Sequence, residues 1–324
     1  MLPPIKFGPK TKKYLSIHDK KIKRIDYFSN DDQQDLLDQD QEQDQSYAKV
    51  FYALYDEQCL AAIKFVINQH PNNIFFQNEI NAMQLCMDCS HIIHALDIIV
   101  SEDGTYFGIV TDLKDQDIFQ CVSYGQEFEE GKACLIMYQV LNAIKFIHQK
   151  FLVHRNVNPS NVLISNANNY PQICLTGLSL MEDGTAAISW KCGVPCFWAP
   201  EIVKGDNYSY PVDIWAAGIL MIYILTRAIP FNQENENLRD IMILKGISSE
   251  FLNQYNLSDE AKDLIMKMTE MDSIKRITAA EALDHPWFKN FFSEQTIYIK
   301  KLCEPFKDAQ QAAKHYEGEN DSNE

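Results

Sequence analysis

The order of apolar and polar positions predicts strands early in the chain and helices later. Residues 49–66 are rich in Val, Phe, Tyr and Ile around a polar break at 56–58, which is typical of a β-hairpin. Residues 73–88 have helical spacing, and YFGIVTDL at 106–113 indicates another strand. Helical spacing then dominates at 130–150, 212–226, 259–271 and 279–283. We therefore expect an α+β fold with a small strand-rich lobe containing one main helix, a larger helical lobe, and a cleft between them.

Two segments do not fit this pattern. Residues 31–45, DDQQDLLDQDQEQDQ, contain seven acids, six glutamines and no basic residue, which is typical of low-complexity sequence without a packed core. The chain ends in the polar stretch HYEGENDSNE. The predicted organisation is a basic arm at 1–24, a first lobe at 25–113 carrying the insert 31–45, a second lobe at 114–291, and a tail at 292–324.

Composition and charge restrict the classes of partner. Of the 324 residues 46% are hydrophobic, so most of the chain should be globular. The net charge of −16 argues against nucleic acid or an anionic membrane as a general partner. The first 24 residues differ, because they hold eight Lys or Arg against one acid. This arm is predicted to be a solvated tail, although it could also dock on an acidic surface.

The sequence also indicates the compartment. The start, MLPPIKFGPKTKK, lacks the apolar segment of a secretory signal, and the longest apolar run, at 214–226, is too short to span a bilayer. Nine scattered cysteines suit free thiols in a reducing environment. Cys86 and Cys89 lack a second pair at zinc-site spacing, so we interpret them as thiols rather than metal ligands. The expectation is a soluble cytoplasmic protein without a membrane span.

Several short motifs occur in an order typical of one family. They are AIK (62–64), QNEINAM around Glu79, TDL (111–113), VHRNVNPSNVL (153–163), APE (199–201), VDIWAAGI (212–219) and KRITAAEALDHPWF (275–288). Together they resemble the eukaryotic protein kinases, in particular the calcium/calmodulin-dependent group of Ser/Thr kinases, over roughly residues 25–291. The resemblance implies the bilobal protein kinase fold, with a β-rich N-lobe and an α-helical C-lobe.

The resemblance also assigns roles to individual residues. It implies that Lys64 grips the α- and β-phosphates of ATP and pairs with Glu79, although a Lys–Glu pair can also tie a strand to a helix without nucleotide. The other positions that match nucleotide-binding residues are Val50, Ala62, Thr111, Leu113, Asn161 and Leu163. Structural roles are implied for His154, Arg155, Asp213, Glu201 and Arg276, the last two as a pair.

The phosphate-binding loop departs from the family pattern. Backbone N–H groups can approach phosphates only where side chains do not block them, so the family uses glycines. Here no glycine occurs between Gly8 and Gly104, and the acidic insert lies where those glycines are expected. Calcium binding by the insert is a weaker alternative, because Gln43 and Lys49 stand where a calcium loop needs Gly and Glu.

The catalytic loop departs as well. Asn156 occupies the position of the family's proton-accepting aspartate, and an amide cannot take a proton at neutral pH. Asn158 replaces the lysine that steadies the transferred phosphate, and Val194 replaces a threonine that touches both positions. Three linked positions are therefore degenerate together.

The predicted metal site is incomplete. Leu175 aligns with the aspartate that bridges magnesium to the phosphates, and leucine offers no oxygen ligand. Asn161, the second ligand, is present, but one neutral amide is not expected to hold the ion. Thr176 replaces an aromatic residue, which should weaken the active arrangement. Glu182 and Asp183 could substitute as ligands, but we expect them on a mobile segment.

These residues predict a pseudokinase that works as a scaffold or allosteric regulator of a protein partner, such as an active kinase. ATP could still bind without metal, and Mg²⁺ is not expected. The alternative is a weakly active Ser/Thr kinase with an altered metal site. An enzyme of another class on the same fold has no positive feature in the sequence. Arg155 could also hold a phosphate or a carboxylate in the activation segment, with Thr185 and Ser189 as candidate phosphosites.

Overall fold

The computed structural model describes residues 22–24, 48–55, 59–67, 74–100, 106–167 and 170–294. Of the predicted basic arm only Ile22–Arg24 is described. The acidic insert and the tail beyond Glu294 lie outside the described residues.

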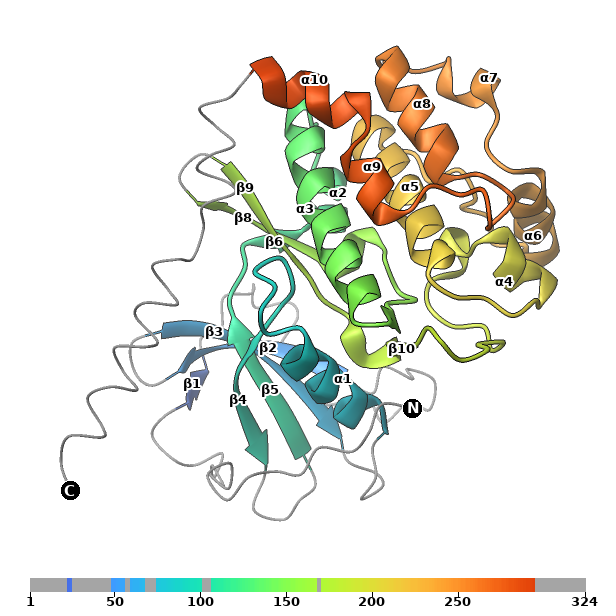
Figure 1. The fold of residues 1–324 in the computed structure, drawn as a ribbon. Coiled ribbons are helices and arrows are strands. Elements are labelled where there is room, and N and C mark those ends of the chain that lie inside the picture. The colour runs from blue at the N-terminus through green and yellow to red at the C-terminus, as the bar shows by residue number, and fades with distance from the viewer. Residues whose placement is uncertain are drawn as a thin grey trace.

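The smaller lobe is an antiparallel sheet with one helix packed beside it (Figure 1). The strand order is β1-β2-β3-β5-β4. The strands are β1 (Ile22–Arg24), β2 (Ala48–Tyr55), β3 (Cys59–Ile67), β4 (Ala95–Val100) and β5 (Tyr106–Asp112), and the helix is α1 (Ile74–Leu85). The predicted hairpin is confirmed, because β2 and β3 pair from Ala48–Val66 to Tyr55–Cys59. The predicted strand at 106–113 and the helix within 73–88 are confirmed too, whereas β4 was not predicted.

The larger lobe is built around two long helices. These are α3 (Glu130–Gln149) and α5 (Pro211–Thr226), which pack against each other. In α5 every residue from Val212 to Ile224 is buried, and Asp213 is the one charged residue among them. The helix therefore forms the centre of the lobe. Both helices confirm the sequence prediction. Among the described residues, no helix has the length and apolar character needed to cross a membrane.

Shorter elements surround this core. The helices are α2 (Ile118–Ser123), α4 (Pro200–Lys204), α6 (Glu236–Lys245), α7 (Ser249–Leu252), α8 (Asp259–Met268), α9 (Ala279–Leu283) and α10 (Pro286–Glu294). Single 3-10 turns are η1 (Pro159–Asn161), η2 (Leu178–Leu180) and η3 (Pro195–Phe197). Two small sheets, β6-β8-β9 and β7-β10, use β6 (Gln116–Asp117), β7 (Leu152–Val153), β8 (Val162–Ala167), β9 (Tyr170–Leu175) and β10 (Glu182–Asp183). They lie between the first sheet and the helices and carry the loops of the candidate site (Figure 1).

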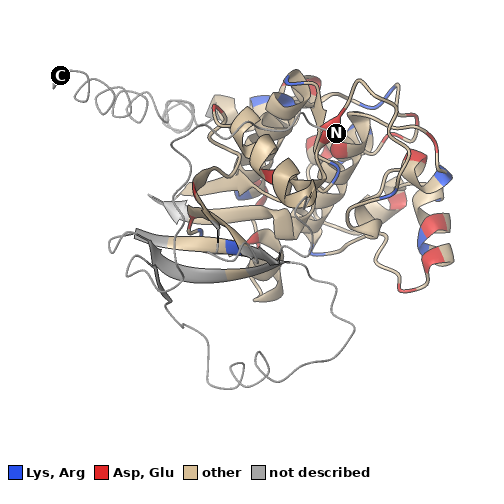
Figure 2. Ribbon diagram, turned by 90° about the horizontal axis from the view of Figure 1, so that it is seen from below, with Lys and Arg blue, Asp and Glu red and all other residues tan. Residues whose placement is uncertain are grey.

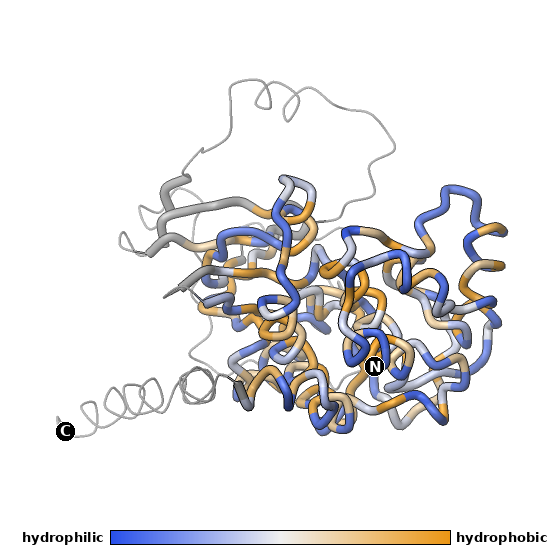
Figure 3. Tube along the Cα trace, turned by 90° about the horizontal axis from the view of Figure 1, so that it is seen from above, coloured by the Kyte–Doolittle hydropathy of each residue, from blue (hydrophilic) through white to orange (hydrophobic). Residues whose placement is uncertain are grey.

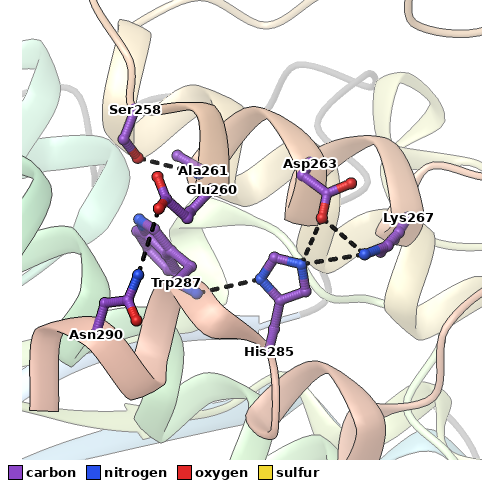
Figure 4. A network of polar contacts seen from close by, with 8 residues as sticks. All are labelled: Ser258, Glu260, Ala261, Asp263, Lys267, His285, Trp287 and Asn290. Atoms are coloured by element: carbon purple, nitrogen blue, oxygen red, sulfur yellow. Dashed lines mark hydrogen bonds and ion pairs between the residues drawn. The ribbon is translucent and has the colours of Figure 1, made fainter. Parts of the chain in front are cut away.

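A polar network fixes the closing helices (Figure 4). His285 Nε2 lies 2.8 Å from the Asp263 carboxylate, which also accepts a hydrogen bond from Lys267 at 2.7 Å. The other ring nitrogen of His285 accepts from the backbone N–H of Trp287 at 3.2 Å. The histidine of the HPWF sequence therefore links α8 to the start of α10.

Candidate functional site

The structure brings Lys64 and Glu79 together. Lys64 lies on β3 and Glu79 on α1, and the ammonium contacts both carboxylate oxygens at 2.7 and 2.9 Å. Glu79 is only 2% exposed, whereas the Lys64 side chain is 30% exposed. The pair ties the helix to the sheet and leaves part of the Lys64 side chain open to solvent.

The positions expected around an adenine base lie on neighbouring strands. Val50 on β2 is the register partner of Lys64, and Ala62 on β3 is the partner of Thr111 on β5. Val50 is 58% exposed, so its side chain is available to a ligand. Leu163, on β8 of the other lobe, is half-buried against the core. Leu113, which follows β5, is half-buried. These residues offer apolar surface from both lobes, and apolar surface gains by being covered.

Asp213 on α5 shapes the candidate catalytic loop. Its two carboxylate oxygens accept the backbone N–H groups of His154 and Arg155, each at 2.8 Å, and His148 Nε2 lies 2.9 Å away. Burial alone would raise the pKa of Asp213, but the His148 hydrogen bond and nearby charges, together with the backbone N–H of His154, hold it below its ordinary value. Arg155 adopts φ 66°, a conformation that costs energy for a residue other than glycine. The Asp213 bonds stabilise that strained turn.

Three asparagine side chains lie at the centre of this loop, and two of them donate hydrogen bonds to Asn156. Asn158 Nδ2 donates to the backbone oxygen of Asn156 at 2.9 Å and to its side-chain oxygen at 3.0 Å. Asn161 Nδ2 donates to the same backbone oxygen at 2.8 Å. The side-chain oxygen of Asn156 thus already accepts a hydrogen bond, and a side-chain amide cannot take up a proton at neutral pH. Asn156, Asn158 and Asn161 therefore form a neutral hydrogen-bonded cluster.

Leu175 belongs to the hydrophobic core. Its side chain is fully buried, its backbone N–H donates to His91 O at 2.8 Å, and its carbonyl accepts from Ile93 N–H at 3.0 Å. The next turn, η2, packs against α1 through the region of fully buried Leu178. Hydrophobic contacts therefore connect this turn to the helix that carries Glu79.

The same region does not fit a magnesium ion. Mg²⁺ prefers several oxygen ligands in octahedral geometry, and Leu175 supplies none. Asn161 offers a single amide oxygen, and Gly177, at φ 77°, passes so close that an added Cβ would lie 2.4 Å from the Asn161 amide nitrogen. Within the ranges that the structure describes, no three His, Cys, Asp or Glu residues are grouped to hold a metal.

The proposed substitute ligands are engaged elsewhere. Glu182 and Asp183 form β10, which pairs with β7. Glu182 lies 3.7 Å from the Arg155 guanidinium, and Asp183 accepts both the N–H and the hydroxyl of Thr185, at 2.8 and 2.6 Å. A strand pairing and side-chain bonds therefore hold both carboxylates in place.

Arg155 has an environment that the sequence did not reveal. Its side chain is completely buried, and its guanidinium lies 3.8 Å from the ring centroid of Trp190. Its Nη2 donates to Cys192 Sγ at 2.8 Å. Trp190 directly follows the exposed candidate phosphosite Ser189. No sequence motif indicates its contact with Arg155, because the two residues are more than thirty positions apart and only the folded chain brings them together. Phosphorylation of Thr185 or Ser189 stays a prediction.

Two further positions complete the site region. Val194, 40% exposed, lines a small cavity with Arg155 and Asn156, and its side chain offers no hydrogen bond to the amide cluster. Glu201 on α4 forms a two-pronged ion pair with Arg276, at 2.7 and 3.0 Å. That pair anchors the end of the activation segment to the closing helices.

The strand-rich lobe, the helical lobe built on α5, and the Lys–Glu pair beside a His-Arg loop define a protein kinase fold. The chain belongs to the protein kinase family, because the model described as the protein kinase domain matches residues 45–288.

The chain is similar to curated protein kinases, among them a serine/threonine-protein kinase and a calcium-dependent protein kinase. The chain is 29% identical to the SNF1-related protein kinase catalytic subunit alpha KIN12 of Arabidopsis thaliana, over 76% of this chain and 49% of the relative. It is 28% identical to serine/threonine-protein kinase DCLK3 of Homo sapiens, over 67% and 34%. It is 32% identical to calcium-dependent protein kinase 3 of Plasmodium yoelii yoelii, over 70% and 43%. The chain thus spans between a third and a half of the length of these relatives.

Proposed function

We propose that this protein uses the kinase fold for binding and transfers no phosphate, acting as a scaffold or allosteric regulator of another protein. The observation that carries the proposal is the buried state of Leu175. A leucine that completes the core, with both backbone groups paired, leaves no carboxylate to bridge a metal to the phosphates. The amide cluster of Asn156, Asn158 and Asn161 supports the same conclusion, because it contains no group able to accept the substrate proton.

We further propose that ATP binds without metal. Lys64, whose side chain is 30% exposed and is oriented by Glu79, would hold a phosphate through its ammonium. Val50 and Ala62 would cover one side of the base and Leu163 the other. In this proposal ATP donates no phosphate, and its binding would only stabilise the arrangement of the two lobes.

The second candidate is a weakly active Ser/Thr kinase, and the formed Lys64–Glu79 pair is the observation that favours it. Such an enzyme would need metal ligands other than Leu175. The two candidates differ in their dependence on metal and in phosphate transfer.

A thermal-shift titration with ATP separates these possibilities. The full chain is titrated with ATP in EDTA, then with Mg²⁺ or Mn²⁺, and the same preparation is incubated with labelled ATP and basic or acidic peptides. We expect a rise of several degrees in melting temperature without metal, and no transferred label. Lys64→Ala should abolish the shift, whereas Lys289→Ala, at an exposed lysine of α10, should not change it.

The outcomes bear on separate parts of the proposal. A melting-temperature shift that requires metal would overturn the proposal of an inactive protein and favour the weakly active kinase. Transfer of label would do the same if Lys64→Ala abolishes it and Lys289→Ala does not. No shift under any condition would remove ATP from the proposal and leave a scaffold without nucleotide.

A further inference from the structure

Helix α6 lies at the outer end of the larger lobe (Figure 1) and carries a row of aliphatic side chains that the described part of the chain leaves partly exposed. Leu238 is 46% exposed, Ile241 50% and Leu244 42%. Residues three apart lie on the same side of a helix, so the three side chains form one continuous stripe. Figure 3 shows apolar segments at this end of the molecule.

The stripe is not the face by which α6 is attached to the lobe. Fully buried Ile243 faces the core, and Arg239 stacks over Trp198 with 5.5 Å between the guanidinium carbon and the ring centroid. Asn235 caps the helix by accepting the N–H of Leu238 at 3.0 Å. The helix is therefore held by its opposite face, and the outward stripe is already formed before any partner arrives.

The charges beside the stripe are mainly negative. Glu234 and Glu236 are exposed at the start of α6, and Asp240, half-buried, pairs with Arg239 at 3.3 Å. The one exposed basic residue of the helix is Lys245, at its end. Figure 2 shows acidic residues at this end of the lobe. A basic ligand would therefore be attracted to the first turn of α6.

The charge also argues against a second copy as the occupant. Each copy carries a net charge of −16, so two copies meeting through this face would repel each other. An amphipathic helix with basic flanks matches both the apolar row and the acids, because such helices dock through anchors spaced three and four residues apart.

We propose that α6 is a docking surface for an amphipathic helix of a partner protein. The apolar side of that helix covers Leu238, Ile241 and Leu244, and its Lys or Arg residues approach Glu234 and Glu236. The proposal deepens the binding role given above and rests on it, since it names the surface through which a scaffold would hold its partner. The stripe is short, so the expected affinity of a single helix is in the micromolar range.

A peptide-binding experiment tests the surface. The probe is a labelled synthetic helix of Leu, Ala and Lys with Leu spaced three and four residues apart, and the companion peptide has Glu in place of every Lys. Binding to the full chain is followed by fluorescence anisotropy at physiological salt, without nucleotide. We expect the Lys peptide to bind and the Glu peptide not to bind, with hydrogen-exchange protection concentrated in Glu236–Lys245.

Matched variants localise the effect. Replacing Leu238 and Ile241 by Gln, which keeps helix propensity, should weaken the Lys peptide by about tenfold or more. Leu85→Gln changes a leucine of similar exposure, 43%, on α1 and should leave affinity unchanged. Glu234→Gln with Glu236→Gln should weaken the Lys peptide and reduce the dependence of binding on salt.

Three results would overturn the docking surface. The first is equal affinity for the α6 variants, the Leu85→Gln variant and the unchanged chain, which would indicate general attraction to an acidic protein. The second is protection outside α6. The third is a dimer in light scattering that Ile241→Gln abolishes, which would make a second copy the occupant. Because nucleotide is absent, none of these results depends on whether the protein transfers phosphate.

Discussion

Placing a carboxyl group at Leu175 tests the central structural observation. In a functioning metal site this substitution should restore a ligand, whereas in a packed core it should unfold the protein. Leu175 is fully buried, and its backbone is paired on both sides with the segment around Ile92. We therefore expect Leu175→Asp, alone or with Asn156→Asp, to destabilise the chain without producing phosphate transfer.

The magnitude follows from two contributions. Removing a fully buried leucine side chain forfeits about 2–3 kcal/mol of apolar burial. An unpaired buried carboxyl has its pKa raised by up to about 3–5 units, each worth about 1.4 kcal/mol. Because the group protonates once its pKa exceeds the pH, the penalty at neutral pH is limited to about 3 units, or about 4 kcal/mol. The sum, about 6–7 kcal/mol, is comparable with the whole stability of an ordinary domain.

Leu175→Asn is the matched control, because it has the same shape without the charge. Because the pKa of the Asp variant is raised in the folded state, burying its carboxyl carries no charge penalty at a pH below the ordinary carboxyl pKa. The penalty then increases as the pH rises toward the pKa of the folded state. The Asp variant should therefore be close to the Asn variant at about pH 4 and clearly less stable at about pH 8, as measured by urea unfolding. If the two variants are equally stable at the higher pH, and the Asp variant binds ATP in a Mg²⁺-dependent way, the carboxyl reaches solvent and the reasoning is wrong.

Two further predictions concern buried charges. Arg276→Met leaves Glu201 in a largely buried site without its partner and should cost about 3–5 kcal/mol in urea unfolding. Adding Glu201→Gln should recover part of that loss, and a single variant with stability near that of the unchanged chain would contradict the role given to the pair. Asp213→Asn removes charge-assisted hydrogen bonds to the loop and should cost about 2–3 kcal/mol at neutral pH. The pKa of Asp213 is held below its ordinary value in the folded protein. The stability that its carboxylate contributes is therefore fully present at a pH above the ordinary pKa, and is lost as the pH falls through the pKa of the folded state. The difference between Asp213→Asn and the unchanged chain should thus shrink in acid, and a constant difference would refute the assignment.

Much of the site could be read from the residues themselves. Side-chain chemistry is local, so Asn156 and Leu175 were enough to predict that a proton acceptor and a metal ligand are missing before any geometry was known. The environment of Arg155 could not be read in this way. Trp190 and Cys192 reach it from a distant part of the chain, and only chain folding determines such contacts.

The hydrophobic pattern by itself determined the hairpin, the main helices and the two-lobed class, because periods of two and of 3.6 residues reflect backbone geometry alone. It did not determine which apolar residues face inward. In α6 the spacing of Leu238, Ile241 and Leu244 is equally typical of a core stripe, yet Ile243 and Arg239 hold the helix to the lobe and the stripe faces solvent. Periodicity defines a face of a helix, but only the neighbouring elements decide whether that face is covered.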